Sequence, residues 1–187
     1  MDDPTTGRAA PPAEIAPDTK DWTWTLERTC PDCGLAAGTI PASEISARVT
    51  ACTDPWSSVL ARSDARVRPE PSTWSPLEYA CHVRDVCALF TDRLTLLRAG
   101  DGPTFENWDQ DRTATEQRYA EQDPATVAGQ LAAAAQGLSS AFAGVPDDAW
   151  SRSGTRSDGS PFTVLTLGRY GLHDLAHHLW DVGVDVP

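Results

Sequence analysis

The chain has 187 residues, of which 40% are hydrophobic and seven are tryptophan, enough to build a sizeable core in one domain. Its formal net charge of −12 argues against nucleic acid as a partner, because nucleic-acid binding uses basic patches. No apolar run reaches the length of a membrane span, and the first residues lack the pattern of a secretory signal. We therefore expect a globular cytoplasmic protein with no membrane partner, whose five cysteines are thiols.

Residues 1–20 show no apolar periodicity, which predicts a flexible tail. Residues 21–40 form a separate segment that carries two tryptophans and the CxxC pair Cys30 and Cys33. Such a pair can bind zinc or cycle as a dithiol, but this kind of zinc site needs a second ligand pair at suitable spacing, and none follows. We favour a turn that anchors the segment on the domain through Trp22 and Trp24, with the zinc or redox role as the alternative.

The folded domain is expected over residues 41–187, where helical periodicity begins. The first helix starts near Pro41, with Ser43 as a possible N-cap, and its apolar residues recur at three- and four-residue steps as far as Val59. Pro55 falls inside this pattern, which predicts a kink or an interruption there.

The second helix has the clearest start signal in the chain. Ser75 is a favourable N-cap, Pro76 suits the first helical position, and Glu78 completes a capping box. The apolar stripe then continues to about Ala99, where a glycine follows. His82 borders this stripe, so we expect its side chain to point into the domain.

Two further helices complete the pattern. A long polar loop over residues 100–123 is expected to cover the site or to connect helices, and Asp123 caps a third helix that ends near Phe142. Residues 151–161 are expected to be irregular, with Ser160 as the N-cap of the fourth helix and a proline directly after it. Four helices without convincing strands predict an all-α protein, a four-helix bundle.

The four histidines of the chain are concentrated in two of these helices. His173 and His177 are four residues apart, so both lie on one face of the fourth helix. Together with His82 they could supply three imidazoles to one metal ion and leave coordination positions open, which is the arrangement of catalytic sites. The alternative is that the two helix-four histidines only pack or form hydrogen bonds.

At these residues the chain resembles the DinB/YfiT-like superfamily of four-helix proteins. The resemblance covers about residues 41–183 and rests on the segments Trp74–His82 and His173–His178. It implies a divalent metal ion, zinc or nickel in most cases, with three ligands: His82, His173 and His177. His178 falls outside this set, and we expect it to be a supporting or structural residue. The CxxC segment is not part of the general family pattern.

The superfamily includes thiol-dependent S-transferases and mycothiol-dependent maleylpyruvate isomerases. The resemblance therefore implies transfer of a low-molecular-weight thiol such as mycothiol to a small electrophilic substrate. Arg169, one turn before His173, is a candidate catalytic residue that would hold a substrate carboxylate or phosphate, although an ordinary ion pair is the alternative. Asp85 and Asp181 could orient imidazoles, or they could be solvated surface residues.

Two other functions stay open from the sequence. One is a metal-activated hydrolase that uses the same ligands, and the other is a non-catalytic module that binds metal or a ligand. The number of tryptophans would also suit a homodimer.

Overall fold

The computed structural model of the chain describes residue 15 and residues 20–187. The flexible tail predicted at residues 1–20 therefore lies outside the described residues, except for Ile15 and Lys20. The helices are α1 (Ala42–Thr53), α2 (Trp56–Leu60), α3 (Pro76–Ala99), α4 (Gln110–Glu116), α5 (Pro124–Ala143) and α6 (Val164–Asp181). The 3-10 helices are η1 (Thr23–Leu26), η2 (Ala37–Thr39), η3 (Tyr119–Glu121) and η4 (Asp147–Ala149). The strands are β1 (Thr104–Phe105), β2 (Ser153–Arg156) and β3 (Pro161–Thr163).

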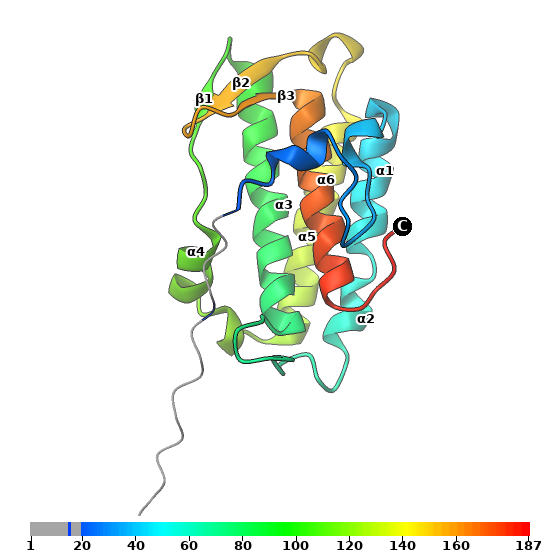
Figure 1. Ribbon diagram of the computed structural model, residues 1–187, viewed down its shortest axis with the longest axis vertical. Coiled ribbons are helices and arrows are strands. Elements are labelled where there is room, and N and C mark those ends of the chain that lie inside the picture. Colours follow the sequence, from blue (N-terminus) through cyan, green and yellow to red (C-terminus); the bar gives the residue numbers. More distant parts are fainter. Residues whose placement is uncertain (1–14, 16–19) are drawn as a thin grey trace, which may run out of the picture.

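The helices α1, α3, α5 and α6 form a bundle (Figure 1). Both α1 and α3 pack against α5 and α6, so α1 and α3 lie at opposite corners of the bundle. The N-terminal segment with η1 and η2 packs on the outer side of α6 (Figure 1). The predicted all-α four-helix bundle is confirmed, with α1 and α2 as the two parts of a helix interrupted at Pro55.

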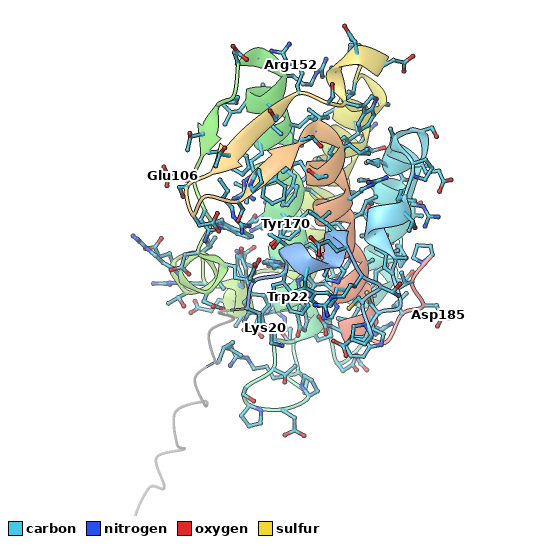
Figure 2. The ribbon with its side chains drawn as sticks, turned by 45° about the horizontal axis from the view of Figure 1, so that its top comes forward. Lys20, Trp22, Glu106, Arg152, Tyr170 and Asp185 are labelled. Atoms are coloured by element: carbon cyan, nitrogen blue, oxygen red, sulfur yellow. The ribbon has the colours of Figure 1, made fainter. Side chains whose placement is uncertain are left out.

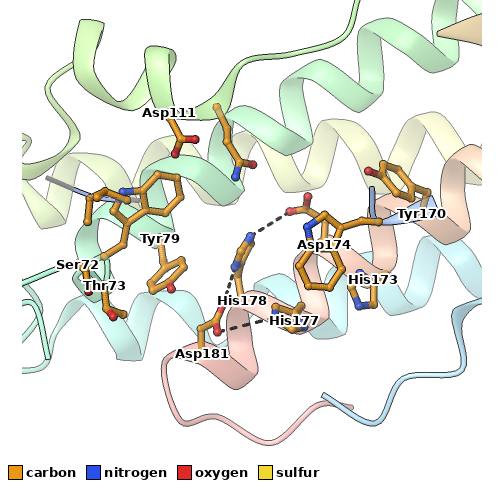
Figure 3. Close-up of a pocket in the computed structure, with 14 residues that line it drawn as sticks. Ser72, Thr73, Tyr79, Asp111, Tyr170, His173, Asp174, His177, His178 and Asp181 are labelled. Carbon is orange, nitrogen blue, oxygen red and sulfur yellow. Dashed lines mark hydrogen bonds and ion pairs between the residues drawn. The ribbon is translucent and has the colours of Figure 1, made fainter. Parts of the chain in front are cut away.

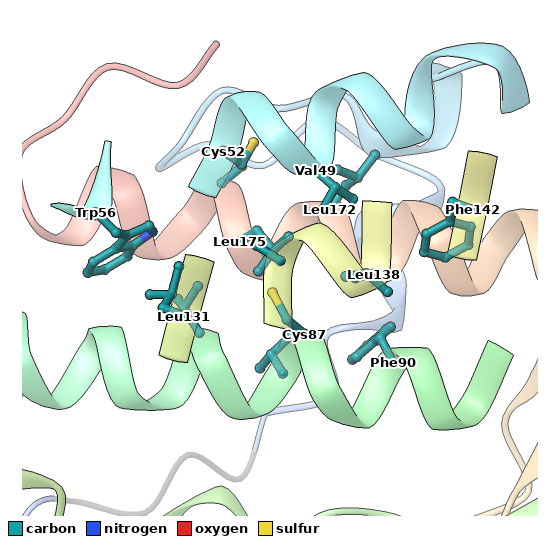
Figure 4. Close-up of a cluster of buried hydrophobic side chains, with 14 of the residues drawn as sticks. Val49, Cys52, Trp56, Cys87, Phe90, Leu131, Leu138, Phe142, Leu172 and Leu175 are labelled. Carbon is teal, nitrogen blue, oxygen red and sulfur yellow. The ribbon is translucent and has the colours of Figure 1, made fainter. Parts of the chain in front are cut away.

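The core lies along the bundle axis and draws on all four corners (Figure 4). Trp56, Leu131, Leu138 and Leu175 are among its large, fully buried side chains. Burial of one such side chain stabilises the fold by about 1.5–3 kcal/mol, so this core outweighs any single surface interaction. In the described part of the chain, no helix has both the length and the apolar character to cross a bilayer.

Close approach at two glycines fixes how α6 sits in the bundle. A Cβ atom on Gly168 would lie 2.8 Å from Cδ1 of Ile45, and one on Gly171 would lie 2.7 Å from Cδ1 of Phe90. Both distances are shorter than van der Waals contact, so the glycines allow α6 to approach α1 and α3. The rotation of α6 about its own axis is set by these contacts.

The predicted starts of α3 and α5 are confirmed. Ser75 Oγ accepts a hydrogen bond from the backbone N–H of Glu78, and Glu78 Oε2 accepts one from the N–H of Ser75 at 2.8 Å. Asp123 caps α5 by accepting from the N–H of Thr126 at 2.8 Å. Ser43 is not the N-cap of α1, because Pro41 takes the capping position with an extended backbone and the helix begins at Ala42.

The predicted start of the fourth helix is wrong by three residues. Residues 161–163 pair with β2 as an antiparallel strand, so α6 begins at Val164 with Thr163 as its N-cap. Gly159, at φ +92°, allows the tight turn between β2 and β3. β1 adds a parallel strand on the other side of β2, so part of the segment expected to be irregular belongs to a three-stranded sheet.

Candidate metal centre

Helix α6 presents two rows of candidate ligands. Residues four apart lie nearly above one another on a helix, whereas neighbours differ by about 100°. His173 and His177 therefore form one row, and Asp174 and His178 form the next. The first row faces the N-terminal segment, and the second faces α3.

The second row meets His82 of α3. Oδ1 of Asp174 lies 3.3 Å from Nε2 of His82 and 3.5 Å from Nε2 of His178. Donor atoms bound to one ion in tetrahedral geometry are separated by about 3.3–3.5 Å. The three residues, hereafter the HDH group, therefore have the separations of ligands that share a metal ion.

The protonation states of the HDH group favour metal binding. His82 is fully buried, and burial lowers the pKa of its imidazole, so the ring is neutral at pH 7. Burial acts to raise the pKa of Asp174, but the interaction and hydrogen bond with the imidazole of His82 outweigh it and hold this pKa at about 2. A neutral imidazole and an ionised carboxylate are the forms that bind a cation.

One nitrogen of His82 takes no part in the contact with Asp174. Nδ1 of His82 is buried and has no hydrogen-bond partner among the described residues. Two imidazoles and one carboxylate with open coordination positions are a ligand set used for zinc and for non-haem iron. The HDH group therefore fits a divalent cation.

Aromatic rings hold the imidazoles of the HDH group in place. Trp108 stacks on His82, with ring centroids 5.2 Å apart and an interplanar angle of 13°. The ring centroid of Trp74 lies 5.4 Å from that of His82, and the ring centroid of Tyr79 lies 5.1 Å from that of His178. Apolar surroundings of this kind limit the access of water to the imidazoles.

A cavity of about 280 Å³ opens beside Asp174 and His178 (Figure 3). Both rows of α6 contribute to its wall, together with Trp22 of the N-terminal segment. The further lining residues are Ile15, Ser72, Thr73, Trp74, Tyr79, Gln110, Asp111, Tyr170 and Asp181. Trp22, next to η1, and Tyr170, in α6, both border the cavity, and Figure 2 shows η1 lying across α6.

The first row of α6 meets the CxxC pair. One ligand atom from each of Cys30, Cys33, His173 and His177 lies within 4.8 Å of the other three. Sγ of Cys30 is 3.7 Å from Nδ1 of His177. Burial and the charge of His177 lower the pKa of His173 to about 4, and burial raises the pKa of the Cys33 thiol to about 11. We call these four residues the CCHH group.

The ligand set predicted from the sequence is thus divided between the two groups. His82 belongs to the HDH group, whereas His173 and His177 belong to the CCHH group. A triad of these three histidines is not assembled in the described residues and stays only a prediction. Sequence reasoning left Asp174 out of the ligand set, although Asp174 and His178 have the same four-residue spacing one position further along.

The other candidate residues have identifiable contacts. Nε of Arg169 donates a hydrogen bond to the backbone oxygen of Ile40 at 2.8 Å, and Arg169 does not line the 280 Å³ cavity. Its role in holding substrate stays a prediction. Asp85 accepts hydrogen bonds from Arg84 and Tyr119, whereas Asp181 accepts one from Nδ1 of His178 at 2.7 Å.

Comparison with known proteins agrees with the fold. The family sequence model of the DinB superfamily matches residues 47–182 of the chain. YfiT from Bacillus subtilis, described as a probable metal-dependent hydrolase with an unusual four-helix bundle topology, is similar in structure with a TM-score of 0.58. The two share 16% sequence identity over 74% of this chain and 78% of YfiT, and this likeness shows the fold. No curated protein matches the chain. Since the family match covers well over half of its residues, the chain belongs to the DinB superfamily.

Proposed function

We propose that the chain is a metal-dependent enzyme that activates a nucleophile for attack on a small electrophilic molecule. The observation that carries the proposal is the position of Asp174, whose Oδ1 lies between Nε2 of His82 and Nε2 of His178 at the wall of a cavity. Three ligands on two rigid helices leave positions open toward the cavity. That is the arrangement of a catalytic metal site and not of a closed structural one.

A divalent ion in the HDH group would lower the pKa of a thiol or a water molecule beside it, so that the nucleophile forms at neutral pH. The protein residues have separate tasks. His82, Asp174 and His178 would hold the ion, and Asp181 fixes the ring of His178 by accepting its Nδ1 proton. The aromatic side chains around His82 keep bulk water from its imidazole.

The favoured reaction is transfer of a low-molecular-weight thiol, such as mycothiol, to a small acceptor. The cavity volume of about 280 Å³ suits a small molecule and not a polymer. Ser72, Thr73 and Gln110 offer hydrogen-bonding groups along its wall, which suits a hydroxyl-rich thiol. The family resemblance supports the same reaction class.

Hydrolysis is the second candidate, and one further observation favours it. Asp111 lines the same cavity from α4, on the far side from α6 (Figure 3), where a carboxylate could accept a proton from an attacking water molecule. The description of YfiT supports the same class.

The test is turnover by the metal-loaded protein with a panel of electrophiles, each measured with and without mycothiol or another small thiol. Consumption of an electrophile only when thiol is present supports transfer, and consumption without thiol supports the hydrolase. Asp174→Asn and His82→Asn should lower kcat/KM by at least about 100-fold, because each removes a ligand. Asp185→Asn, an exposed carboxylate beyond the end of α6, is the matched control and should retain activity. Metal binding without turnover would leave a binding module and overturn the proposal.

A further inference from the structure

The CCHH group is separate from the HDH group and has a different chemistry. It joins two thiols of the N-terminal segment to two imidazoles of α6, and the three donors other than His177 come from buried residues. Exposure is 0% for Cys30, 8% for Cys33 and 4% for His173. Four convergent donors leave little room for a substrate or water.

The backbone around the two cysteines is a closed turn. The N–H of Cys30 donates to the oxygen of Leu35 at 3.0 Å, and the N–H of Gly34 donates to the oxygen of Cys30 at 3.0 Å. Gly34 adopts φ +74°, a conformation that side-chain-bearing residues rarely take. This turn reverses the chain directly after Cys33 and presents both thiols to the same side, toward α6.

Distances across the group agree with one shared ion. Sulfur and nitrogen ligands of a tetrahedral zinc ion lie about 3.6 Å from each other. The separation of Cys30 Sγ and His177 Nδ1 is 3.7 Å, and all four donors lie within 4.8 Å of one another. In addition, Nε2 of buried His173 has no hydrogen-bond partner among the described residues, so the protein itself leaves this donor unused.

Charge balance and donor type favour zinc. The −2 charge of two thiolates and two neutral imidazoles cancels the charge of a divalent cation, and a buried site without net charge avoids the cost of burying an unpaired charge. Sulfur and nitrogen donors in fourfold convergence are the ligands that zinc prefers in structural sites. The HDH group differs, because its single carboxylate offsets only part of the charge of a divalent cation and its three ligands leave coordination positions open.

We propose that Cys30, Cys33, His173 and His177 bind a structural zinc ion that fastens residues 20–40 to α6. Binding exchanges the two thiol protons for the metal and closes its coordination shell. This inference does not depend on the proposed function, because the ion sits in other ligands and takes no part in a reaction.

The zinc site would also complete the cavity wall. The ring of Trp22 lies 5.6 Å from that of His173 and 5.2 Å from that of His177, and Trp22 lines the 280 Å³ cavity. Release of the cysteine turn from α6 removes the support of this ring. Loss of the zinc ion is therefore expected to open the cavity, although the HDH ligands stay in place on α3 and α6.

The test replaces zinc with cobalt(II) in the full chain. Cobalt bound to thiolates in tetrahedral geometry gives a thiolate-to-metal charge-transfer band and intense visible bands, whereas an HDH site has no thiolate and gives no such transfer band. Wild-type protein, stripped by a chelator and titrated with cobalt(II), should show the thiolate band, and about one equivalent of zinc should abolish it.

Three variants assign the band to its residues. Cys30→Ser together with Cys33→Ser should lose it and retain the metal bound by the HDH group. His82→Asn should keep it, and so should Cys52→Ser, which removes a buried thiol of α1 outside both groups. Circular dichroism of each variant checks that the bundle remains folded.

Two results would overturn the zinc site, and neither needs a variant. One is cobalt-loaded wild-type protein without a thiolate band. The other is wild-type protein purified without a chelator that contains no zinc and whose intact mass shows the loss of two hydrogens, mapped to a disulfide between Cys30 and Cys33. The turnover assay tests the HDH group, and the cobalt spectrum tests the CCHH group. Failure of one inference therefore does not imply failure of the other.

Discussion

Oδ2 of Asp181 lies 2.7 Å from Nδ1 of His178, and its other carboxylate oxygen lies 4.0 Å from Nε2 of His177. His177 and His178 are adjacent in the chain but belong to different ligand groups. One carboxylate at the end of α6 therefore contacts imidazoles of both. A carboxylate in this position fixes the ring orientation and raises the basicity of the nitrogen that faces the ligand group.

Replacement of this carboxylate is expected to weaken metal binding without removing a ligand. Asp181→Asn should lower the affinity for a divalent ion by about 10–100-fold, the usual effect of losing a carboxylate that supports a ligating histidine. The measurement is a competition titration with a chromophoric chelator. Asp185→Asn removes an equal charge from an exposed position nearby and should leave the affinity unchanged. Equal affinities for wild type and Asp181→Asn would contradict this role.

The close approach of α6 to α3 predicts opposite effects for two glycine substitutions. Gly171→Ala places a Cβ 2.7 Å from the ring of Phe90 and should destabilise the fold by about 1–3 kcal/mol through overpacking. Gly137→Ala, in α5 where the added Cβ would meet no neighbouring part of the structure within 4 Å, should stabilise it by about 0.5–1 kcal/mol. Urea denaturation of both variants measures the difference. A stabilised Gly171→Ala would show that the two helices are less tightly packed.

The ion pair of Glu78 and Arg68 predicts a dependence of stability on pH. Burial acts to raise the pKa of Glu78, but hydrogen bonds from Arg68 and Ser75 outweigh it and hold this pKa below its usual value. The stabilisation is therefore present above the pKa of the unfolded state and is lost as pH falls through the folded pKa. Glu78→Gln keeps a capping side chain and removes the charge.

We expect Glu78→Gln to cost about 1.5–3 kcal/mol of unfolding free energy at pH 7, the value of a hydrogen bond to a charged group. The cost should shrink as the pH falls toward the range where the wild-type carboxyl is protonated. Thermal denaturation of both proteins across this pH range is the measurement. A cost that is independent of pH would assign the effect to packing and not to charge.

Arg169→Ala separates two roles of one side chain. Its hydrogen bond to the backbone of Ile40 predicts a loss of about 1 kcal/mol in stability. The substrate-holding role predicted from the sequence requires in addition a rise in KM with metal content unchanged. Denaturation and steady-state kinetics on the same variant measure both, and a KM equal to that of wild type would rule out the substrate role.

Local chemistry made several features of the fold predictable. The starts of α3 and α5 follow from Ser75 and Asp123, whose side chains bond to backbone groups only three residues away. The interruption at Pro55 also follows from a single residue. The strand at residues 161–163 was not predictable in this way, because its pairing with β2 depends on the turn at Gly159 and not on apolar alternation.

The site was less accessible from sequence because it depends on the rotation of one helix. Spacing shows that residues 173 and 177 share a face and that 174 and 178 share the next one. Which face meets His82 is decided by the packing of α6 through Gly168 and Gly171, a tertiary contact. Likewise, the partners of the CxxC pair lie more than a hundred residues downstream, so no local zinc motif could reveal them.

Helix α6 supplies two ligands to each group and follows α1, α3 and α5 in the chain. During translation, Cys30, Cys33 and His82 therefore emerge from the ribosome long before the residues that complete their groups. Neither group can be filled on a nascent chain that lacks residues 173–178. The ions proposed for the two groups could therefore bind only after the synthesis of α6, and a truncated chain that ends before this helix would carry none of the completed groups.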